Sequence, residues 1–138
     1  MKTYIGKIEK LKDNEIFIFG SNFQGRHGKG SAKFALDKCG AKYGNPRGIQ
    51  GKSYAIITKD LTKRKHPSVD SWFIMQQIEE LYEFTKKYPN LDFLIAYSGT
   101  GNNLNGYSNQ EMARFFSSFD IPDNIVFEEE FSKLLSII

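Results

Sequence analysis

Short apolar runs, separated by polar or glycine-rich segments, are the main pattern along this chain of 138 residues. Runs of β-branched and aromatic residues are typical of strands that are covered on both faces of a sheet. The weak alternation of apolar and polar residues at Thr3–Ile8 predicts a strand at the sheet edge. We predict buried strands at Ile16–Phe19, Ser53–Thr58 and Asp92–Ala96, and a last strand at Asn124–Glu128.

Segments with apolar residues at helical spacing lie between these strands. The longest begins at Ser68, a predicted N-cap, and ends before Tyr88, and its packing face is expected to include Trp72. Shorter helices are predicted at Ser31–Cys39, Ser108–Phe116 and Glu130–Ile137, the second of them opened by a capping box. Because strands alternate with helices, we expect a single α/β domain over residues 1–138, a three-layer α/β/α sandwich with a mixed, mostly parallel central sheet.

The most informative segment joins the first buried strand to the first helix. Its glycines allow backbone N–H groups to approach a ligand, since glycine has no Cβ. A helix N-terminus attracts anions, and Arg26, His27 and Lys29 add positive charge there. The segment matches neither the dinucleotide fingerprint nor the nucleotide-triphosphate loop. We interpret it as an anion-binding loop, the alternative being an ordinary tight connection between strand and helix. The glycines are Gly20, Gly25, Gly28 and Gly30.

A second glycine-rich loop, Tyr97–Tyr107, follows the strand at Asp92–Ala96. Its glycines, hydroxyls and asparagines supply many small donors for a diphosphate or a ribose, although a flexible hairpin-like loop is the simpler alternative. Ligands of open α/β sheets bind at the carboxyl ends of the strands, so we expect both loops at one end of the sheet. Asp60 ends another strand, where it is either a ribose ligand or base, or a turn carboxylate. Gly40–Gly51 is expected to be a surface loop.

Composition narrows the function classes. The net charge of +3 weakly favours an anionic ligand and does not suggest a general nucleic-acid binder. Cys39 is the single cysteine, which excludes an internal disulfide framework and fits a reducing compartment. The N-terminus lacks an apolar signal core and no apolar stretch is long enough to span a membrane, so a cytoplasmic protein without a membrane partner is expected. His27 and His66 are the only histidines, and no metal or cofactor is expected.

Three segments together resemble a family of small phage and bacterial proteins related to macro domains. They are F-G-S-N-F-Q-G-R-H-G-K-G-S-A at Phe19–Ala32, G-K-S-Y-A-I-I-T-K-D at Gly51–Asp60 and S-G-T-G-N-N-L-N-G-Y at Ser98–Tyr107. The resemblance covers nearly the whole chain. It implies a mixed sheet between helices and the binding of ADP-ribose, whose ester or glycosidic bonds some macro domains hydrolyse.

The resemblance also implies roles for individual residues. Asn22 corresponds to the asparagine that contacts the distal ribose, and Ser98–Tyr107 to the loop that closes over the phosphates, with Tyr107 in its aromatic position. Lys29 stands where hydrolytic macro domains often have an aspartate. The residues expected to bind the ligand are Gly20, Ser21, Asn22, Gly25, Arg26, Gly28, Lys29, Gly30, Ser31, Thr58, Ser98, Gly99, Thr100, Gly101, Asn102, Gly106 and Tyr107.

The main functional prediction is a binding protein for ADP-ribose or a related nucleotide or NAD-derived metabolite. The alternative is an ADP-ribosyl hydrolase in which Asn22 holds the ribose and His27 or Asp60 is the general base. An ADP-ribosylated macromolecule is then an additional partner. A module that only binds other proteins would leave the two loops without a purpose.

Overall fold

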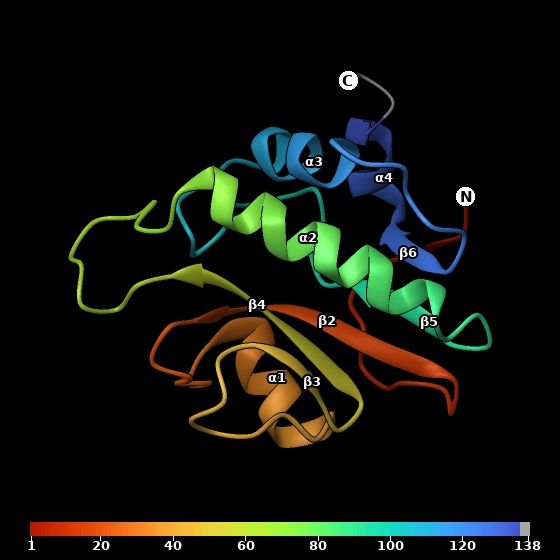
Figure 1. Cartoon of the computed structure of the whole chain (residues 1–138), viewed down its shortest axis with the longest axis horizontal. Coiled ribbons are helices and arrows are strands. Elements are labelled where there is room, and N and C mark those ends of the chain that lie inside the picture. The colour runs from red at the N-terminus through yellow and green to blue at the C-terminus, as the bar shows by residue number, and fades with distance from the viewer. Residues whose placement is uncertain (136–138) are drawn as a thin grey trace.

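The central strand of the sheet explains why helices are needed on both of its sides. In β2 (Glu15–Asn22), Ile16 and Ile18 belong to one apolar cluster, whereas Phe17 and Phe19 belong to a second cluster on the opposite face. Successive side chains of a strand point to opposite faces, so this continuous apolar run requires two covering layers. The computed structural model describes residues 1–135 and contains both layers (Figure 1).

The middle layer is a six-stranded sheet with the order β1-β6-β5-β2-β4-β3. Neighbouring strands are parallel, except that β3 is antiparallel to β4. The predicted mixed, mostly parallel sheet is therefore confirmed. The other strands are β1 (Thr3–Tyr4), β3 (Gly48–Gln50), β4 (Ser53–Lys59), β5 (Asp92–Ile95) and β6 (Ile125–Glu128).

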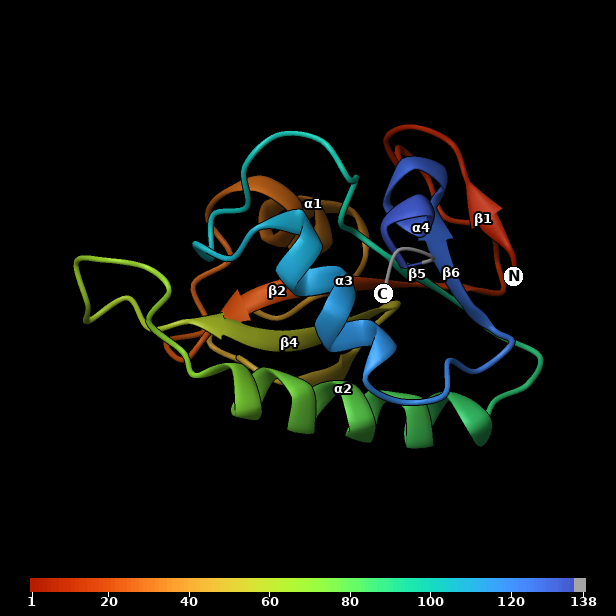
Figure 2. The ribbon, with the colours of Figure 1, turned by 90° about the horizontal axis from the view of Figure 1, so that it is seen from above.

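The outer layers are formed by α1 (Gly30–Lys38), α2 (Ser71–Lys86), α3 (Asn109–Ser117) and α4 (Glu129–Leu135). Ala32 and Ala35 of α1 pack on the face that carries Phe17 and Phe19. Buried residues of the other three helices pack on the opposite face, and Figures 1 and 2 show α1 separated by the sheet from α2 and α3. The predicted α/β/α sandwich is thus confirmed. No helix in residues 1–135 is long and apolar enough to cross a membrane.

Several predicted boundaries and one predicted side-chain position are wrong. The long helix starts at Ser71 with Asp70 as its N-cap, while the Ser68 hydroxyl accepts a hydrogen bond from the Asp60 N–H at 2.8 Å. Trp72 is 62% exposed because it lies on the outer side of α2, where its Nε1 donates to Asp70. The edge strand is limited to β1.

The segment predicted as a surface loop contains β3, whose three residues pair with β4. This pairing was missed because glycines at both ends of β3 hide a strand that has little apolar character of its own. The capping box at the start of α3 is confirmed in both of its hydrogen bonds. Ile137, the predicted end of the last helix, lies outside the described residues.

Candidate functional site

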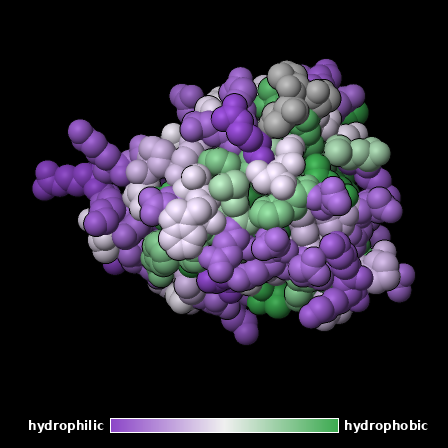
Figure 3. Space-filling model, turned by 45° about the horizontal axis from the view of Figure 1, so that its top comes forward, coloured by the Kyte–Doolittle hydropathy of each residue, from purple (hydrophilic) through white to green (hydrophobic). Residues whose placement is uncertain are grey.

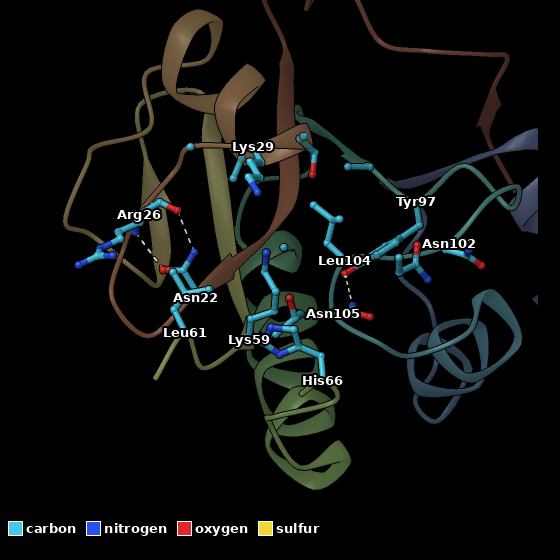
Figure 4. A pocket seen from close by; sticks show the side chains of 18 of the residues that line it. Asn22, Arg26, Lys29, Lys59, Leu61, His66, Tyr97, Asn102, Leu104 and Asn105 are labelled. Carbon is cyan, nitrogen blue, oxygen red and sulfur yellow. Dashed lines mark hydrogen bonds between the residues drawn. The ribbon is translucent and has the colours of Figure 1, made fainter. Parts of the chain in front are cut away.

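A pocket of about 670 Å³ lies at the carboxyl ends of β5, β2 and β4, which are neighbours in the sheet (Figure 4). These strands and the residues that follow them contribute Asn22, Lys59 and Tyr97 to its wall. Both glycine-rich loops also line it. The expectation that the two loops meet at one end of the sheet is confirmed.

The structure places many of the predicted ligand-binding residues in the wall of this pocket. Those that line it are Gly20, Asn22, Arg26, Gly28, Lys29, Gly30, Ser31, Thr58, Ser98, Thr100 and Asn102. Ser21, Gly25, Gly99, Gly101, Gly106 and Tyr107 are not among the described lining residues. The second group therefore needs a different explanation.

The pocket wall is positively charged. Arg26, Lys29 and Lys59 all line it, and no carboxylate is found among the lining residues in the described part of the chain. None of the three has an ion-pair partner within residues 1–135. Burial and the neighbouring charge of Lys29 lower the pKa of Lys59. In Figure 4 the side chains of Lys29 and Lys59 point toward the same space, which therefore favours an anion.

The N-terminus of α1 adds to this potential. The helix begins at Gly30, one residue before the predicted start at Ser31, and its N-cap residue Lys29 makes no side-chain capping bond. The first turn contains no acidic residue. The first N–H groups of a helix have no partner within the helix, and here they lie in the pocket wall with Gly28 and Gly30. Such an end favours a phosphate or carboxylate.

Asn22 shapes the glycine loop through both atoms of its amide. Its Oδ1 accepts from the Arg26 N–H at 2.9 Å, and its Nδ2 donates to the Arg26 carbonyl at 2.8 Å (Figure 4). The side chain is only 3% exposed, yet it lines the pocket. Asn22 therefore holds the loop so that Arg26 and Gly28 face the pocket, and its second amide hydrogen is left for a ligand.

The two predicted general bases lie outside the pocket wall, which is a correction to the prediction. His27 is fully buried, its ring packs edge-on against Phe19, and its Nε2 lies 3.1 Å from the Asn45 carbonyl. The Asp60 carboxylate accepts from the hydroxyl and N–H of Thr62 and from Gln24. These hydrogen bonds, those of Thr62 first, lower the pKa of Asp60. His27 thus supports the loop from beneath, and Asp60 closes a turn.

Close backbone packing explains several glycines that were predicted to contact a ligand. Gly25 has a φ of 66°, and a Cβ there would lie 2.5 Å from the carbonyl carbon of Gly44. A Cβ at Gly99 would lie 2.6 Å from the Phe131 nitrogen, and one at Gly106 would collide with the His66 carbonyl. These glycines therefore fasten the loops to neighbouring segments.

The other predicted residues outside the wall have structural contacts too. Ser21 is fully buried within β2, and its carbonyl accepts from Thr58 at 3.3 Å. The Gly101 carbonyl accepts from Asn109 at 3.3 Å. The Tyr107 hydroxyl donates to the Val69 carbonyl at 2.6 Å, so this aromatic residue ties the second loop to the start of α2.

Sequence reasoning missed several lining residues. Lys59 and Tyr97 directly end or follow predicted strands, so the strand-end rule applied to each strand would have found them. Leu61 and His66 come from the loop between β4 and α2. This loop projects from the protein as a hydrophilic extension (Figures 1 and 3), but these two of its residues line the pocket. No local pattern indicates this placement. The other missed residues are Ala32, Ala96, Asn103, Leu104 and Asn105.

His66 is held in the wall by its own loop. Its Nδ1 is hydrogen-bonded to the Ser68 hydroxyl at 2.6 Å, and that hydroxyl also accepts from the Asp60 N–H. Ser68, predicted as a helix N-cap, therefore orders the end of β4 and places His66. The other ring nitrogen of His66 makes no hydrogen bond within residues 1–135, and it is available to a molecule in the pocket.

Comparison of the chain with family models, with curated proteins and with solved structures finds no match. The relation to macro domains accordingly stays an interpretation of the three motifs.

Proposed function

We propose that this chain binds ADP-ribose or a related nucleotide or NAD-derived metabolite in the pocket at the strand ends. The observation that carries the proposal is the lining by Arg26, Lys29 and Lys59 without a carboxylate among the described lining residues. A diphosphate compensates these charges and accepts hydrogen bonds from the free N–H groups of α1. The volume of about 670 Å³ is in the range of pockets for small molecules.

The neutral part of the wall supports a nucleotide more than a bare phosphate. Ser98, Thr100 and Asn102 of the second loop add hydroxyl and amide groups to the pocket wall. Leu61 and Leu104 add apolar surface. Cationic, hydroxyl-bearing and apolar groups together suit a ligand that has phosphates, a sugar and a base.

Binding, and not hydrolysis, is the activity that we propose. The hydrolytic alternative requires a base near the ribose, and the two residues predicted for that role, His27 and Asp60, do not line the pocket. Their side chains are engaged with Asn45 and Thr62. No specific observation favours the hydrolase.

Titration calorimetry with ADP-ribose tests the proposal. The wild type is expected to bind. Replacing Lys29 or Lys59 by alanine is expected to weaken binding by about tenfold, because each variant lacks one charged contact with the phosphates. Added salt should weaken binding as well, since it screens these contacts. Lys38→Ala is the matched control, because it removes an exposed lysine from the far end of α1.

Two outcomes would count against the proposal. One is the absence of binding for ADP-ribose, NAD and ADP alike at millimolar concentration. The other is an affinity that does not change in Lys29→Ala or Lys59→Ala. Mass spectrometry of the recovered ligand distinguishes binding from turnover, since a hydrolase would release a cleaved product and a binding protein returns the ligand intact.

A further inference from the structure

Three aromatic rings form a cluster beside the start of α2, outside the pocket. Phe23 follows β2 and stacks on Phe73, with ring centroids 5.7 Å apart and 3° between the ring planes. The Trp72 ring meets Phe73 edge-on at 5.8 Å. Phe23 is 45% exposed and Trp72 is 62% exposed, and none of the three is among the described lining residues of the pocket. We call these three residues the aromatic cluster.

Polar contacts hold the aromatic cluster in place. The Trp72 Nε1 donates to the Asp70 carboxylate at 3.2 Å. The Arg47 guanidinium lies over the Phe73 ring at 5.3 Å from its centroid, and it forms an ion pair with Glu80 at 2.6 Å. A partner that packs on these rings therefore loses little entropy in ordering them.

A strongly basic loop lies next to the aromatic cluster. Lys63, Arg64 and Lys65 follow one another in the loop between β4 and α2, and all three are exposed. Figure 3 shows this loop as a hydrophilic extension of the surface. None of the three cations has an ion-pair partner in the part of the chain that the structure describes. The three charges are thus available to a polyanion.

Both ends of this loop are close to the aromatic cluster. At its start, the Phe23 N–H donates to the Lys59 carbonyl at 3.1 Å, and the Leu61 N–H donates to the Gln24 side chain at 2.9 Å. At its other end, the loop leads into α2, whose second residue is Trp72. Figure 1 shows the loop extending from the end of the sheet at which α2 begins. Rings and cations therefore form one continuous surface, which we call the loop surface.

Exposed rings beside consecutive cations are typical of sites for single-stranded nucleic acid. Unpaired bases stack on aromatic side chains, and the phosphates between them contact basic groups. A duplex keeps its bases stacked inside, and an acidic peptide would use the cations without the rings. The net charge of +3 alone did not suggest such a partner, because it does not show that cations and exposed rings meet at one place.

We propose that the loop surface binds single-stranded nucleic acid. A base stacks on Trp72, while Lys63, Arg64 and Lys65 contact the phosphates of neighbouring nucleotides. This partner is additional to the ligand of the pocket, and the inference does not depend on the proposed function.

Trp72 is the only tryptophan of the chain, so its fluorescence reports stacking directly. An oligothymidine of about ten nucleotides without terminal phosphates is expected to quench this fluorescence at low salt. The same oligonucleotide annealed to its complement should bind about tenfold more weakly, because its bases are no longer free to stack.

Replacing Trp72 tests the stacking contact. Trp72→Ala should weaken binding of the fluorescein-labelled oligonucleotide by about tenfold, measured by anisotropy, and Trp72→Phe by less, because it keeps an aromatic ring. Tyr88→Ala is the matched control, since Tyr88 is an aromatic residue that is 45% exposed beyond the other end of α2. Thermal unfolding of each variant shows that the fold is retained.

Replacing the cations tests the phosphate contacts. Changing Lys63, Arg64 and Lys65 together to glutamine should weaken binding and make the slope of log K against log salt shallower by about 2, at roughly 0.7 for each lost phosphate contact. The matched control changes Lys7, Lys10 and Lys12 to glutamine. It removes the same charge from exposed residues that precede β2.

Four results would overturn the inference: unchanged Trp72 fluorescence, equal affinity for the duplex, an unchanged affinity of Trp72→Ala, or tighter binding of polyglutamate than of the oligonucleotide. Lys29→Ala separates the loop surface from the pocket. It should weaken ADP-ribose binding and change oligonucleotide affinity by less than about twofold, since distant sites act independently. A loss of oligonucleotide binding in Lys29→Ala as large as in Trp72→Ala would place the strand in the pocket and contradict the inference. Failure of ADP-ribose to bind would overturn the proposed function alone.

Discussion

Gly25 and Gly28 are three residues apart in the loop between β2 and α1, yet their surroundings differ. Gly25 is buried and has a positive φ, and its carbonyl oxygen accepts a hydrogen bond from the Gly44 N–H at 2.8 Å. Gly28 is exposed, and a Cβ there would meet no atom within 4 Å. One glycine fastens the loop to the protein, and the other faces the pocket.

Alanine should therefore destabilise the protein at Gly25 but have little effect at Gly28. Gly25→Ala is expected to lower the free energy of unfolding by roughly 3 kcal/mol, because it combines a left-handed backbone with a collision against Gly44. Gly28→Ala should change it by less than about 0.5 kcal/mol. Urea unfolding followed by circular dichroism measures both. Equal stability of the two variants would contradict the assigned roles.

At the residue scale, the sequence predicted which chemical groups gather but not where each side chain points. The cations of the glycine loop were recognised, and Arg26 and Lys29 do line the pocket. His27 belongs to the same run, but burial against Phe19 takes its ring out of the pocket. The conformation of the loop decides whether a side chain faces the pocket or the core. A loop has no regular periodicity, so the sequence does not indicate this direction.

At the element scale, two serines near helix starts allow a direct comparison. Ser108 is a true N-cap: its hydroxyl accepts from the Glu111 N–H at 3.0 Å, and Glu111 accepts in return from the Ser108 N–H. Ser31 lies one residue inside α1 and makes no cap. The same residue type therefore has different energetic value in the two helices.

Ser108→Ala should lower the free energy of unfolding by about 1 kcal/mol, since the N-cap hydrogen bond of α3 is lost. Ser31→Ala should leave it unchanged or raise it by up to about 0.5 kcal/mol, because alanine is the better helix former at an interior position. Chemical denaturation of both variants in parallel is the measurement. A loss of the same size for Ser31→Ala would mean that Ser31 caps α1 after all.

The elements that could be predicted are those with a strong local signal. β2, β4 and β5 are apolar runs with clear ends, and the capping box sets the start of α3. β3 could not be predicted, because its three residues become a strand only by pairing with β4. The N-terminus of α2 was misplaced for a related reason: the Ser68 hydroxyl serves Asp60 and His66, which are tertiary and loop contacts.

At the scale of the whole molecule, the strand order is what creates the candidate site. β5, β2 and β4 are adjacent and parallel, so their carboxyl ends bring together loops that are far apart in the sequence. The sequence predicted this convergence from the strand-end rule, although the return of the β4–α2 loop to the pocket depends on tertiary contacts. Several ionisable side chains are also buried in the core, and their burial makes the stability of the protein depend on pH in the alkaline range.

Burial raises the pKa values of Tyr4 and Tyr82 far above the ordinary range, that of Tyr97 to about 12 and that of Cys39 to about 11. In the unfolded chain tyrosines lose their protons near pH 10 and cysteines at about 8.5. The unfolded state thus releases protons before the folded state does, which favours unfolding as the pH rises. Lys59, whose pKa is lowered, acts in the opposite direction.

The free energy of unfolding should therefore be nearly constant from pH 7 to 8 and fall above pH 10, by up to about 1.4 kcal/mol per pH unit for each buried tyrosine. Urea unfolding at fixed ionic strength between pH 7 and 11 measures the slope. Tyr82→Phe removes one of the contributing hydroxyl groups, so the free energy of unfolding of this variant should fall less steeply above pH 10 than that of the wild type. At neutral pH the variant should be less stable, because the hydrogen bond from the Tyr82 hydroxyl to the Phe116 carbonyl is lost. A free energy that stays level from pH 9 to 11 would show that these hydroxyls are not protected by the core.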